Sequence, residues 1–334
     1  MTTRFFDRRL ARRTVTVGLA GAAAALAAPR LVRAQAKYPD HPVRIILPFG
    51  PGGVADISAR LVAQKLSEVL GQNFVIENQP GPGGIVAARN VLQSPADGYT
   101  LAFFTNGTAI SVALFNELPF DPLKQFVPIS VVGYFDLVFV TAADSSFHTL
   151  GDFLKAAHDQ PGTLNLGSIV VGSTQNLTAQ LFKSMSGADI VIVPFRTSPD
   201  EVVALLRNDI QIEVEFYAAI KPSLQGGKAR ALATSGPRRS PELPDVPTAA
   251  EAGVPGFDVT SWNALYAPAG TPSDVIDTLN KALQQVLADP DIKKRALELG
   301  VDAKGSTPAE LDARMRADID KWGKVIASAK IPKE

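Results

Sequence analysis

A glycine-rich loop near the start of the chain has the composition of an anion-binding site. Its residues are Pro48-Phe49-Gly50-Pro51-Gly52-Gly53-Val54-Ala55-Asp56. Glycines let a ligand approach backbone N–H groups closely, and the N-terminus of a helix attracts negative charge. Asp56 would then cap the following helix or accept a hydrogen bond from a ligand donor. The alternative is a tight turn between a strand and a helix, with Asp56 acting only as a cap.

A second loop, from Gly167 to Asn176, has a similar construction and joins another predicted strand to another predicted helix. Ser173, Thr174 and the local N–H groups could donate to a carboxylate, with Asn176 in the first helical turn. An ordinary Ser or Thr cap is the simpler interpretation of the same residues. If both loops bind, two helix N-termini would face one anionic ligand across a cleft.

The first loop also fits part of a dinucleotide-binding motif, Gly50-x-Gly52-x-x-Ala55. Glu77 ends the next predicted strand at about the spacing expected of a ribose-binding acid. This pattern would make the protein a nucleotide-dependent oxidoreductase. However, Pro51 stiffens the turn, and Asp56 would repel a pyrophosphate at close range. The oxidoreductase therefore stays only as an alternative.

Groups suited to catalysis or metal binding are sparse in this sequence. The histidines, His41, His148 and His158, stand beside no nucleophile motif, and no His, Asp or Glu cluster has metal-ligand spacing. The chain contains no cysteine, which excludes thiolate chemistry and disulfides. We therefore expect a protein that is not an enzyme, with no catalytic residue, metal or cofactor.

Charged residues are unevenly distributed, although 33 basic and 33 acidic side chains give a net charge of zero. Residues 1–36 hold seven arginines and one aspartate, so they carry +6 and the rest of the chain about −6. The basic start, the uncharged residues 14–28 and the small residues Ala34 and Ala36 predict a signal peptide over 1–36, cleaved after Ala36 or Ala34. Arg12-Arg13 resembles a twin-arginine signal, and a general secretory signal is the alternative. The protein should therefore act beyond the cytoplasmic membrane, and its acidic mature part is not expected to bind nucleic acid.

The elements that must position the two loops alternate between short apolar strands and amphipathic helices. In the first half, strands are predicted over 43–47, 74–77 and 99–104, with a helix over 57–70. In the second half, strands are predicted over 164–167, 190–193, 212–216 and 229–234, with helices over 174–185 and 201–207. The chain beyond Pro272 is predicted to be helical. This alternation predicts a parallel sheet covered by helices.

Two further apolar runs, 131–141 and 259–267, bracket the second set of strands and helices. They could be hinge strands that pass between two domains. A mature chain of about 300 residues is long enough for two domains.

The chain from Tyr38 to Ile331 resembles the periplasmic solute-binding subunit of the tripartite tricarboxylate transporters, the Bug receptor family. The resemblance rests on many short motifs in a consistent order. They are Tyr38-Pro39-Asp40, Pro51 to Asp56, Glu77 to Gly84, Pro95 to Tyr99, Pro119 to Pro122, Pro161-Gly162, Leu181 to Lys183, Val193 to Phe195, Gly226 to Ala233, Arg239 to Pro241, Leu243 to Thr248, Thr260 to Trp262 and Ala267 to Pro272.

The resemblance implies an α/β fold of the two-lobed periplasmic binding protein type (type II-like), with two α/β domains joined by two crossover strands. Residues 37–137 plus 260–334 would form lobe 1, and residues 138–259 would form lobe 2. The lobes would close on a small organic carboxylate or related solute, and the receptor, a monomer in the periplasm, would deliver it to membrane permease subunits. A sensor that signals to a membrane partner without transport is the alternative.

The resemblance also implies which residues hold the ligand, largely through backbone N–H groups and ordered water. Those of the first lobe are Phe49, Gly53, Val54, Asp56, Thr105, Asn106 and Thr108. Those of the second lobe are Ser168, Gly172, Ser173, Thr174 and Asn176.

The sequence departs from the family pattern at the far end of the expected pocket. Asn176 stands where a histidine is common, and Phe195-Arg196-Thr197-Ser198 replaces Tyr-Lys-Gly-Gly. Glu213 replaces a common aspartate, and Ile169 to Val171 replace small or polar residues, so one side should be more apolar.

Three side chains near this end have two possible roles each. Arg196 could pair with a second carboxylate of the ligand, or with Glu215 or solvent. Trp262 and Tyr217 could stack on a flat ligand or serve in the core or hinge.

Overall fold

The computed structural model describes residue 1, residues 38–328 and residues 330–334. Apart from Met1, the predicted signal peptide and both cleavage positions lie outside the described residues, so they remain predictions. Within the described ranges, no helix combines the length and the apolar character needed to cross a membrane.

The first set of strands and helices begins with a buried strand rich in β-branched residues and continues into a helix that buries one apolar face. That helix ends at Gly71, whose φ of 74° favours glycine. The elements of this set are β1 (Val43–Leu47), α2 (Val54–Leu70), β2 (Phe74–Asn78), η1 (Pro82–Gly84), α3 (Ile85–Leu92), β3 (Thr100–Thr105) and α4 (Asn106–Leu114).

The second set has the same alternation. Three of its four helices begin at hydroxyl caps, since the side chains of Thr149, Ser173 and Thr197 each accept a backbone N–H of the following turn. The elements are α5 (Leu150–Asp159), β5 (Asn165–Ile169), α6 (Thr174–Ser186), β6 (Val191–Phe195), α7 (Ser198–Leu206), β7 (Ile212–Phe216), α8 (Tyr217–Gln225) and β8 (Ala229–Thr234).

Two long strands, β4 (Phe126–Ala142) and β9 (Thr260–Pro268), connect the sets, at the positions where the sequence predicts hinge strands. β4 pairs with β9 as far as Asp136 and with β7 and β8 from Leu137 and Val138 onward. β4 therefore changes partners next to the predicted lobe boundary at 137/138. The lobe bounds themselves stay a prediction.

The described strands form one nine-stranded sheet with the order β2-β1-β3-β9-β4-β7-β5-β6, and β8 pairs with β4. The prediction of a parallel sheet holds within each set but is wrong where β4 and β9 enter, because their pairs are antiparallel. Parallel neighbours need a helical crossover, whereas β4 and β9 pass directly between the sets.

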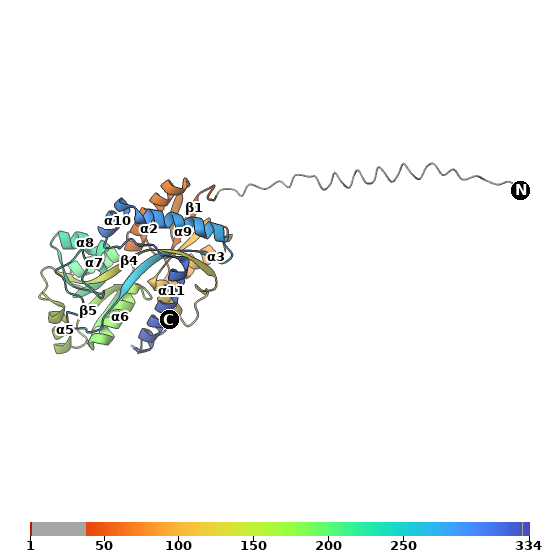
Figure 1. Ribbon diagram of the computed structural model, residues 1–334. Helices are drawn as coiled ribbons and strands as arrows, with labels where there is room; N and C mark the ends of the chain where they lie inside the picture. The colour runs from red at the N-terminus through yellow and green to blue at the C-terminus, as the bar shows by residue number, and fades with distance from the viewer. Residues whose placement is uncertain (2–37, 329) are drawn as a thin grey trace. The chain divides into compact units, whose positions relative to one another are not determined.

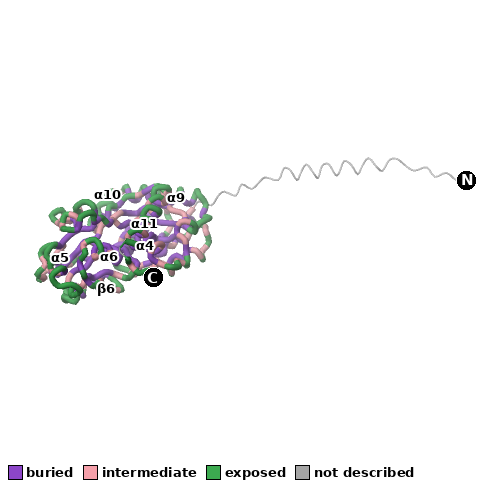
Figure 2. The backbone as a smooth tube through the Cα atoms, turned by 90° about the horizontal axis from the view of Figure 1, so that it is seen from below, coloured by how far each residue is buried: buried purple, intermediate pink, exposed green. Residues whose placement is uncertain are grey.

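The C-terminal segment is helical, as predicted, with α9 (Ser273–Ala288), α10 (Pro290–Leu297) and α11 (Pro308–Ser328). Figure 1 shows β4 crossing between the two sets, with α9 and α10 beside α2. Figure 2 shows exposed backbone on outer helices such as α5 and α10, whereas buried backbone runs through the interior. The core side chains include Phe103, Phe139 and Trp322, each at most 1% exposed, and such burial stabilises by about 1.5–3 kcal/mol for each large side chain.

Candidate ligand-binding site

A cavity of about 550 Å³ lies where the carboxyl ends of strands meet the helices that follow. The loops after β1, β2, β3, β5 and β6 line it, together with side chains from β4, β7 and β9. In open α/β sheets this edge is the usual place for a ligand, because helix N-termini gather there. Both glycine-rich loops singled out in the sequence border this cavity.

The helices α2, α4, α6 and α7 all begin at the cavity. Thr105, Ser173 and Thr197 cap the last three with their hydroxyl oxygens, whereas Gly53 provides no side-chain cap to α2. The first N–H groups of α2 therefore have no intrahelical acceptor and can bind an anion. Four partial positive charges converge on one space, which favours a negatively charged ligand.

Asp56 lies behind the first loop and does not line the cavity. Its carboxylate accepts hydrogen bonds from Gly52 N at 3.1 Å, Arg60 Nε at 3.0 Å and Asn78 Nδ2 at 2.9 Å. Burial by itself would raise the pKa of Asp56, but these hydrogen bonds and the Arg60 charge lower it below its ordinary value. Asp56 therefore holds the first loop in shape from a position outside the cavity lining.

Ser168 and Asn176 support the second loop in the same way. Both are buried, and Asn176 Nδ2 donates to Ser168 Oγ at 3.1 Å. Asn176 N donates to the Ser173 cap at 3.1 Å. Gly172, between them, has a φ of 84°, which favours glycine and turns the chain toward the start of α6.

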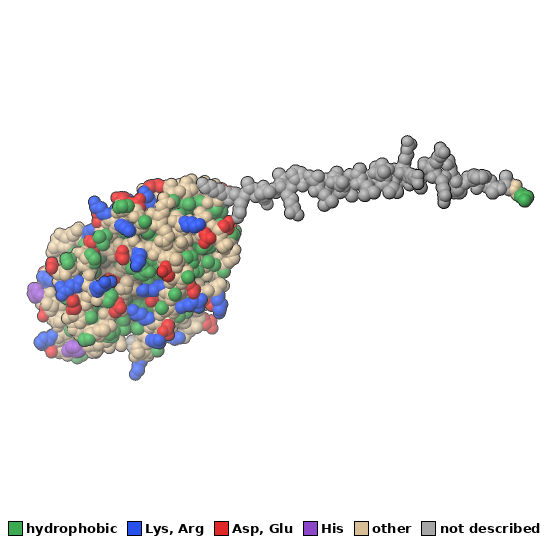
Figure 3. Space-filling model, in the orientation of Figure 1, with side chains coloured by type: hydrophobic (Ala, Val, Ile, Leu, Met, Phe, Trp, Pro, Cys, Tyr) green, Lys and Arg blue, Asp and Glu red, His purple; other side chains and the backbone are tan. Residues whose placement is uncertain are grey.

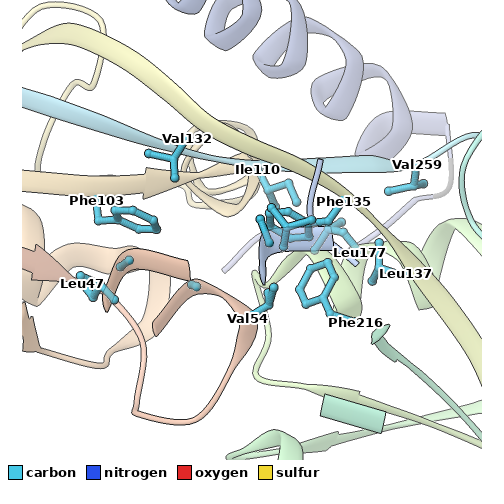
Figure 4. Close-up of a cluster of buried hydrophobic side chains, with 14 of the residues drawn as sticks. Leu47, Val54, Phe103, Ile110, Val132, Phe135, Leu137, Leu177, Phe216 and Val259 are labelled. Atoms are coloured by element: carbon cyan, nitrogen blue, oxygen red, sulfur yellow. The ribbon is translucent and has the colours of Figure 1, made fainter. Parts of the chain in front are cut away.

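An apolar wall lies between the two loops. Val54 of α2, Phe135 of β4 and Phe216 of β7 line the cavity, and Figure 4 shows their side chains grouped where these elements meet. The Phe135 and Phe216 rings pack edge to face with centroids 4.8 Å apart. The second loop extends this wall through Ile169, Val170 and Val171. The wall can bury the hydrocarbon part of a ligand, which is worth about 25 cal/mol per Å² of apolar surface.

Arg196 is the one charged side chain among the described residues that line the cavity. It lies on the exposed loop between β6 and α7, and it has no hydrogen bond or ion pair with any described residue. Glu215, which the sequence offered as a partner for Arg196, is fully buried and bonds to other residues. Arg196 is therefore available to a ligand carboxylate.

Asn106 and Trp262 face away from the cavity, in the contact with α11. Asn106 Oδ1 accepts from Trp322 Nε1 at 2.6 Å. Trp262 is fully buried and donates through Nε1 to Asp318 Oδ2 at 2.5 Å. Of the two roles considered for Trp262, the core position is the one observed.

Tyr217 also lies outside the lining, at the start of α8. Lys221 Nζ lies 5.7 Å from the centre of its ring. A Cβ at Gly300 would meet Tyr217 Cβ at 2.9 Å, so the ring packs closely on the segment after α10. Tyr217 is therefore not positioned to stack on a ligand in this cavity.

The predicted site residues thus divide into two groups. Those that line the cavity are Phe49, Gly53, Val54, Thr105, Thr108, Gly172, Ser173, Thr174 and Arg196. Those outside the lining are Asp56, Asn106, Ser168, Asn176, Glu215, Tyr217 and Trp262. The second group largely supports the loops and strand ends from behind.

Several lining residues were missed by the sequence reasoning. They include Phe135, Gln175, Ser198, Phe216, Ser261 and Asn263. Alternation along a strand could have found two of them, because Ser261 and Asn263 lie on the face opposite to Trp262. Nothing in the sequence marked Phe135, whose position depends on the path of β4.

The features of the oxidoreductase alternative have other partners in the structure. Both Glu77 oxygens bind Arg44, at 2.6 and 2.8 Å, so this acid is not free for a ribose. His41 stacks on Tyr99 with centroids 3.6 Å apart, away from the cavity. Within residues 38–328 and 330–334, no group of three or more His, Asp or Glu residues could hold a metal ion.

A larger hollow, of about 730 Å³, lies beside α11 and the end of the chain. Its lining includes Lys324, Lys330 and Lys333, but no strand end or helix N-terminus opens into it. Figure 3 shows basic and acidic side chains intermixed on the visible face, without a patch of one sign. The smaller cavity is therefore the better candidate for an anion, because its helix N-termini provide local recognition.

Comparisons with known proteins agree with this geometry. A family model described as "Tripartite tricarboxylate transporter family receptor" matches residues 58–331. Protein BugT of Bordetella pertussis is 32% identical over 319 residues, which span 95% of this chain and 97% of BugT.

Two solved structures are also similar over most of the chain. A protein of R. palustris with adipate has a TM-score of 0.85 at 33% identity, covering 89% of this chain and 100% of its own. MatC from Rhodopseudomonas palustris with bound malate has a TM-score of 0.79 at 31% identity, covering 86% and 100%. The α/β fold of periplasmic binding proteins predicted from the sequence is thereby confirmed. The family match and the similarity along nearly the whole chain show that this protein belongs to the tripartite tricarboxylate transporter receptor family.

Proposed function

We propose that this protein is a periplasmic receptor that captures a small organic carboxylate and delivers it unchanged to the membrane permease subunits of a tripartite transporter. The observation that carries this proposal is the convergence of four helix N-termini on one cavity. No acidic side chain lines this cavity in the described chain, and Arg196 adds one positive charge. Its surroundings therefore favour an anion over a cation or a neutral solute.

In this proposal, the first carboxylate of the ligand lies at the uncapped N-terminus of α2, near Gly53 and Val54. The hydrocarbon part packs on Phe135 and Phe216, and Arg196 binds a second carboxylate at the opposite end. Two solved relatives support a dicarboxylate, since they contain adipate and malate. Closure of the predicted lobes around β4 and β9 would then exclude water from the ligand.

The experiment is isothermal titration of the purified protein with adipate, malate, benzoate and NAD. We expect saturable binding of at least one carboxylate and none of NAD, and mass spectrometry of the bound ligand should recover it unchanged. No binding of any carboxylate, with binding of NAD, would overturn the proposal.

A matched pair of variants locates the site. Val171→Asp adds a negative charge at the cavity edge, where the side chain is 38% exposed. Val203→Asp adds the same charge on α7 outside the cavity, where the side chain is 46% exposed. The first variant should weaken carboxylate binding about tenfold by repulsion, and the second should leave it unchanged. Equal effects of both variants would contradict the assignment of the cavity.

The permease partner, export and the monomeric state are tested separately. Deletion of the gene should abolish uptake of the bound carboxylate, whereas a sensor without transport would leave uptake intact and alter only a signalling response.

N-terminal sequencing of the exported protein should start after Ala36 or Ala34, and sedimentation should give a monomer.

A further inference from the structure

Gln175, Ser198 and Phe216 line one part of the cavity, here called its second wall, and three glutamates lie buried together behind it. Glu201 of α7 and Glu213 and Glu215 of β7 are each 0% exposed. Gly167 of β5 leaves room for them, since a Cβ there would meet Glu201 Oε1 at 3.1 Å. The carboxyl oxygens of Glu201 and Glu213 have no hydrogen-bond partner among the described residues. Of these three glutamates, Glu215 is the one whose carboxyl group hydrogen-bonds to residues that line the cavity.

Each hydrogen bond of the Glu215 carboxyl group goes to a residue that lines the cavity. Oε1 accepts from Gln175 Nε2 at 2.9 Å and from Phe216 N at 2.6 Å. Oε2 faces Ser198 Oγ at 2.5 Å. Because one N–H of Gln175 Nε2 is used in this way, its second N–H and its carbonyl oxygen remain for a ligand in either state of Glu215.

A single hydrogen atom lies between Ser198 Oγ and Glu215 Oε2. Which of the two oxygens donates it depends on whether the carboxyl group of Glu215 is ionised. When Glu215 is ionised, the Ser198 hydroxyl donates to Oε2, and Ser198 can offer a ligand only lone pairs. When Oε2 carries a proton, it donates to Ser198 Oγ, and the Ser198 hydrogen is free to turn toward the cavity. Oε1 accepts from the same two donors in both states.

We propose that Glu215 is a positioning residue that sets, through Ser198, whether the second wall of the cavity donates to an anionic ligand or repels it. This proposal rests on the proposed function, because it concerns the affinity for a carboxylate. With Glu215 protonated, Ser198 donates to the ligand. With Glu215 ionised, the Ser198 hydroxyl presents only its lone pairs to the ligand, so affinity for an anion falls as the pH rises.

The groups that face Glu215 are acidic or uncharged. Glu201 approaches from α7 and Glu213 from the same strand, and the adjacent strand β4 pairs Val138 with Glu215. Gln175 of α6 is neutral. From α8, Lys221 is turned away and donates to the carbonyl of Glu298.

Two further residues of neighbouring elements complete these surroundings. From β5, the neutral Gly167 pairs with Glu213. Arg196 is the basic residue of the cavity lining, and it makes no hydrogen bond or ion pair with Glu215. Burial, only partly offset by the hydrogen bonds from Ser198, Phe216 and Gln175, raises the pKa of Glu215 above its ordinary value. The change of state therefore occurs above the normal carboxyl range.

The test is titration of the wild type and of Glu215→Gln with adipate, malate and benzoate from about pH 6 to about pH 9, where these ligands stay ionised. A glutamine amide donates permanently to Ser198, as the protonated acid does. We expect the wild-type affinity to fall about tenfold across this range, as for one lost hydrogen bond to a charged group. The affinity of Glu215→Gln should stay at the high wild-type level throughout.

Two more variants separate this role from a structural one. The Ser198→Ala variant lacks the hydroxyl, so its affinity for the carboxylates should be low already at pH 6. That affinity should then change little with pH. Glu213→Gln changes a buried acid that does not contact Ser198, so its carboxylate affinity should still fall as the pH rises. Any shift of the pH at which the affinity falls should be toward lower pH.

A wild-type affinity that is independent of pH, or a Glu215→Gln variant that keeps the fall, would overturn the role of Glu215 while the receptor function stands. Wild-type protein that binds none of the three carboxylates at any pH would overturn both. If Glu215→Gln does not fold, the comparison of Ser198→Ala with the wild type decides the question.

Discussion

Replacing Glu201 by glutamine should stabilise the protein increasingly as the pH rises. Glu201 is fully buried, and neither of its carboxyl oxygens has a hydrogen-bond partner within the part of the chain that the structure describes. Burial, reinforced by the nearby Glu215 and Glu213 charges, raises the pKa of Glu201 well above its ordinary value. The folded protein therefore keeps a proton that the unfolded chain releases, and the wild type loses stability above the ordinary carboxyl pKa.

The size of this effect follows from proton linkage. For each pH unit in which only the folded state holds the proton, the free energy of unfolding falls by about 1.4 kcal/mol. Between pH 5 and pH 7, Glu201→Gln should therefore gain up to about 3 kcal/mol relative to the wild type. Near pH 4 the two proteins should differ by less than about 1 kcal/mol, because glutamine has the shape of the protonated acid.

Urea unfolding followed by fluorescence measures this difference, since Trp262 and Trp322 are both fully buried in the folded state. The control is Glu117→Gln, which removes the same charge at an exposed position where the side chain makes no hydrogen bond or ion pair with any residue that the structure describes. The control should differ from the wild type by a small amount that does not grow with pH. A Glu201→Gln variant that becomes less stable than the wild type as pH rises would refute the reasoning, because Glu201 would then be ionised and stabilised.

Four other substitutions have expected effects on stability. Gly167→Ala places a Cβ 2.4 Å from Ile210 Cδ1, so it should cost about 1–3 kcal/mol in urea unfolding, whereas Gly50→Ala meets nothing within 4 Å and should be nearly neutral. Asp56→Ala removes the acceptor of three donors and should cost about 2 kcal/mol at pH 7; since the pKa of Asp56 is lowered, the loss should shrink as the pH falls below the carboxyl range. Asp318→Ala leaves a buried indole N–H without its acceptor and should cost about 2 kcal/mol, with carboxylate affinity unchanged in calorimetry.

Local sequence patterns predicted the elements of the fold well. The strands Val43–Leu47, Ile212–Phe216 and Ala229–Thr234 lie where short stretches rich in apolar residues placed them, because strand and helix periodicity depend on neighbouring residues. The glycine-rich loops were also readable, since glycine and the cap residues act within one turn. Sequence periodicity could not predict that β4 and β9 run antiparallel to their neighbours. That direction depends on how strands from the two sets pair with each other in the folded protein.

Most of the first-loop and cap residues predicted for the cavity line it, because a βα loop and a helix N-terminus lie at the same edge of the sheet. The residues that lie outside the lining differ from the expectation in orientation. Trp262 was selected on a strand whose alternate residues, Ser261 and Asn263, face the cavity. Asp56 was expected at the ligand, but nearby donors turn its carboxylate behind the loop.

By itself, the sequence determined which loops are rich in free N–H groups and which helices they begin, since these properties are set by adjacent residues. Only the tertiary structure decided that Glu215 bonds to Gln175 and Ser198 from two helices, and that Glu201 and Glu213 share its interior. The physical reason is that burial and hydrogen-bond partners arise from segments far apart in the chain. The charge of a glutamate can be read from the sequence, whereas its surroundings exist only after folding.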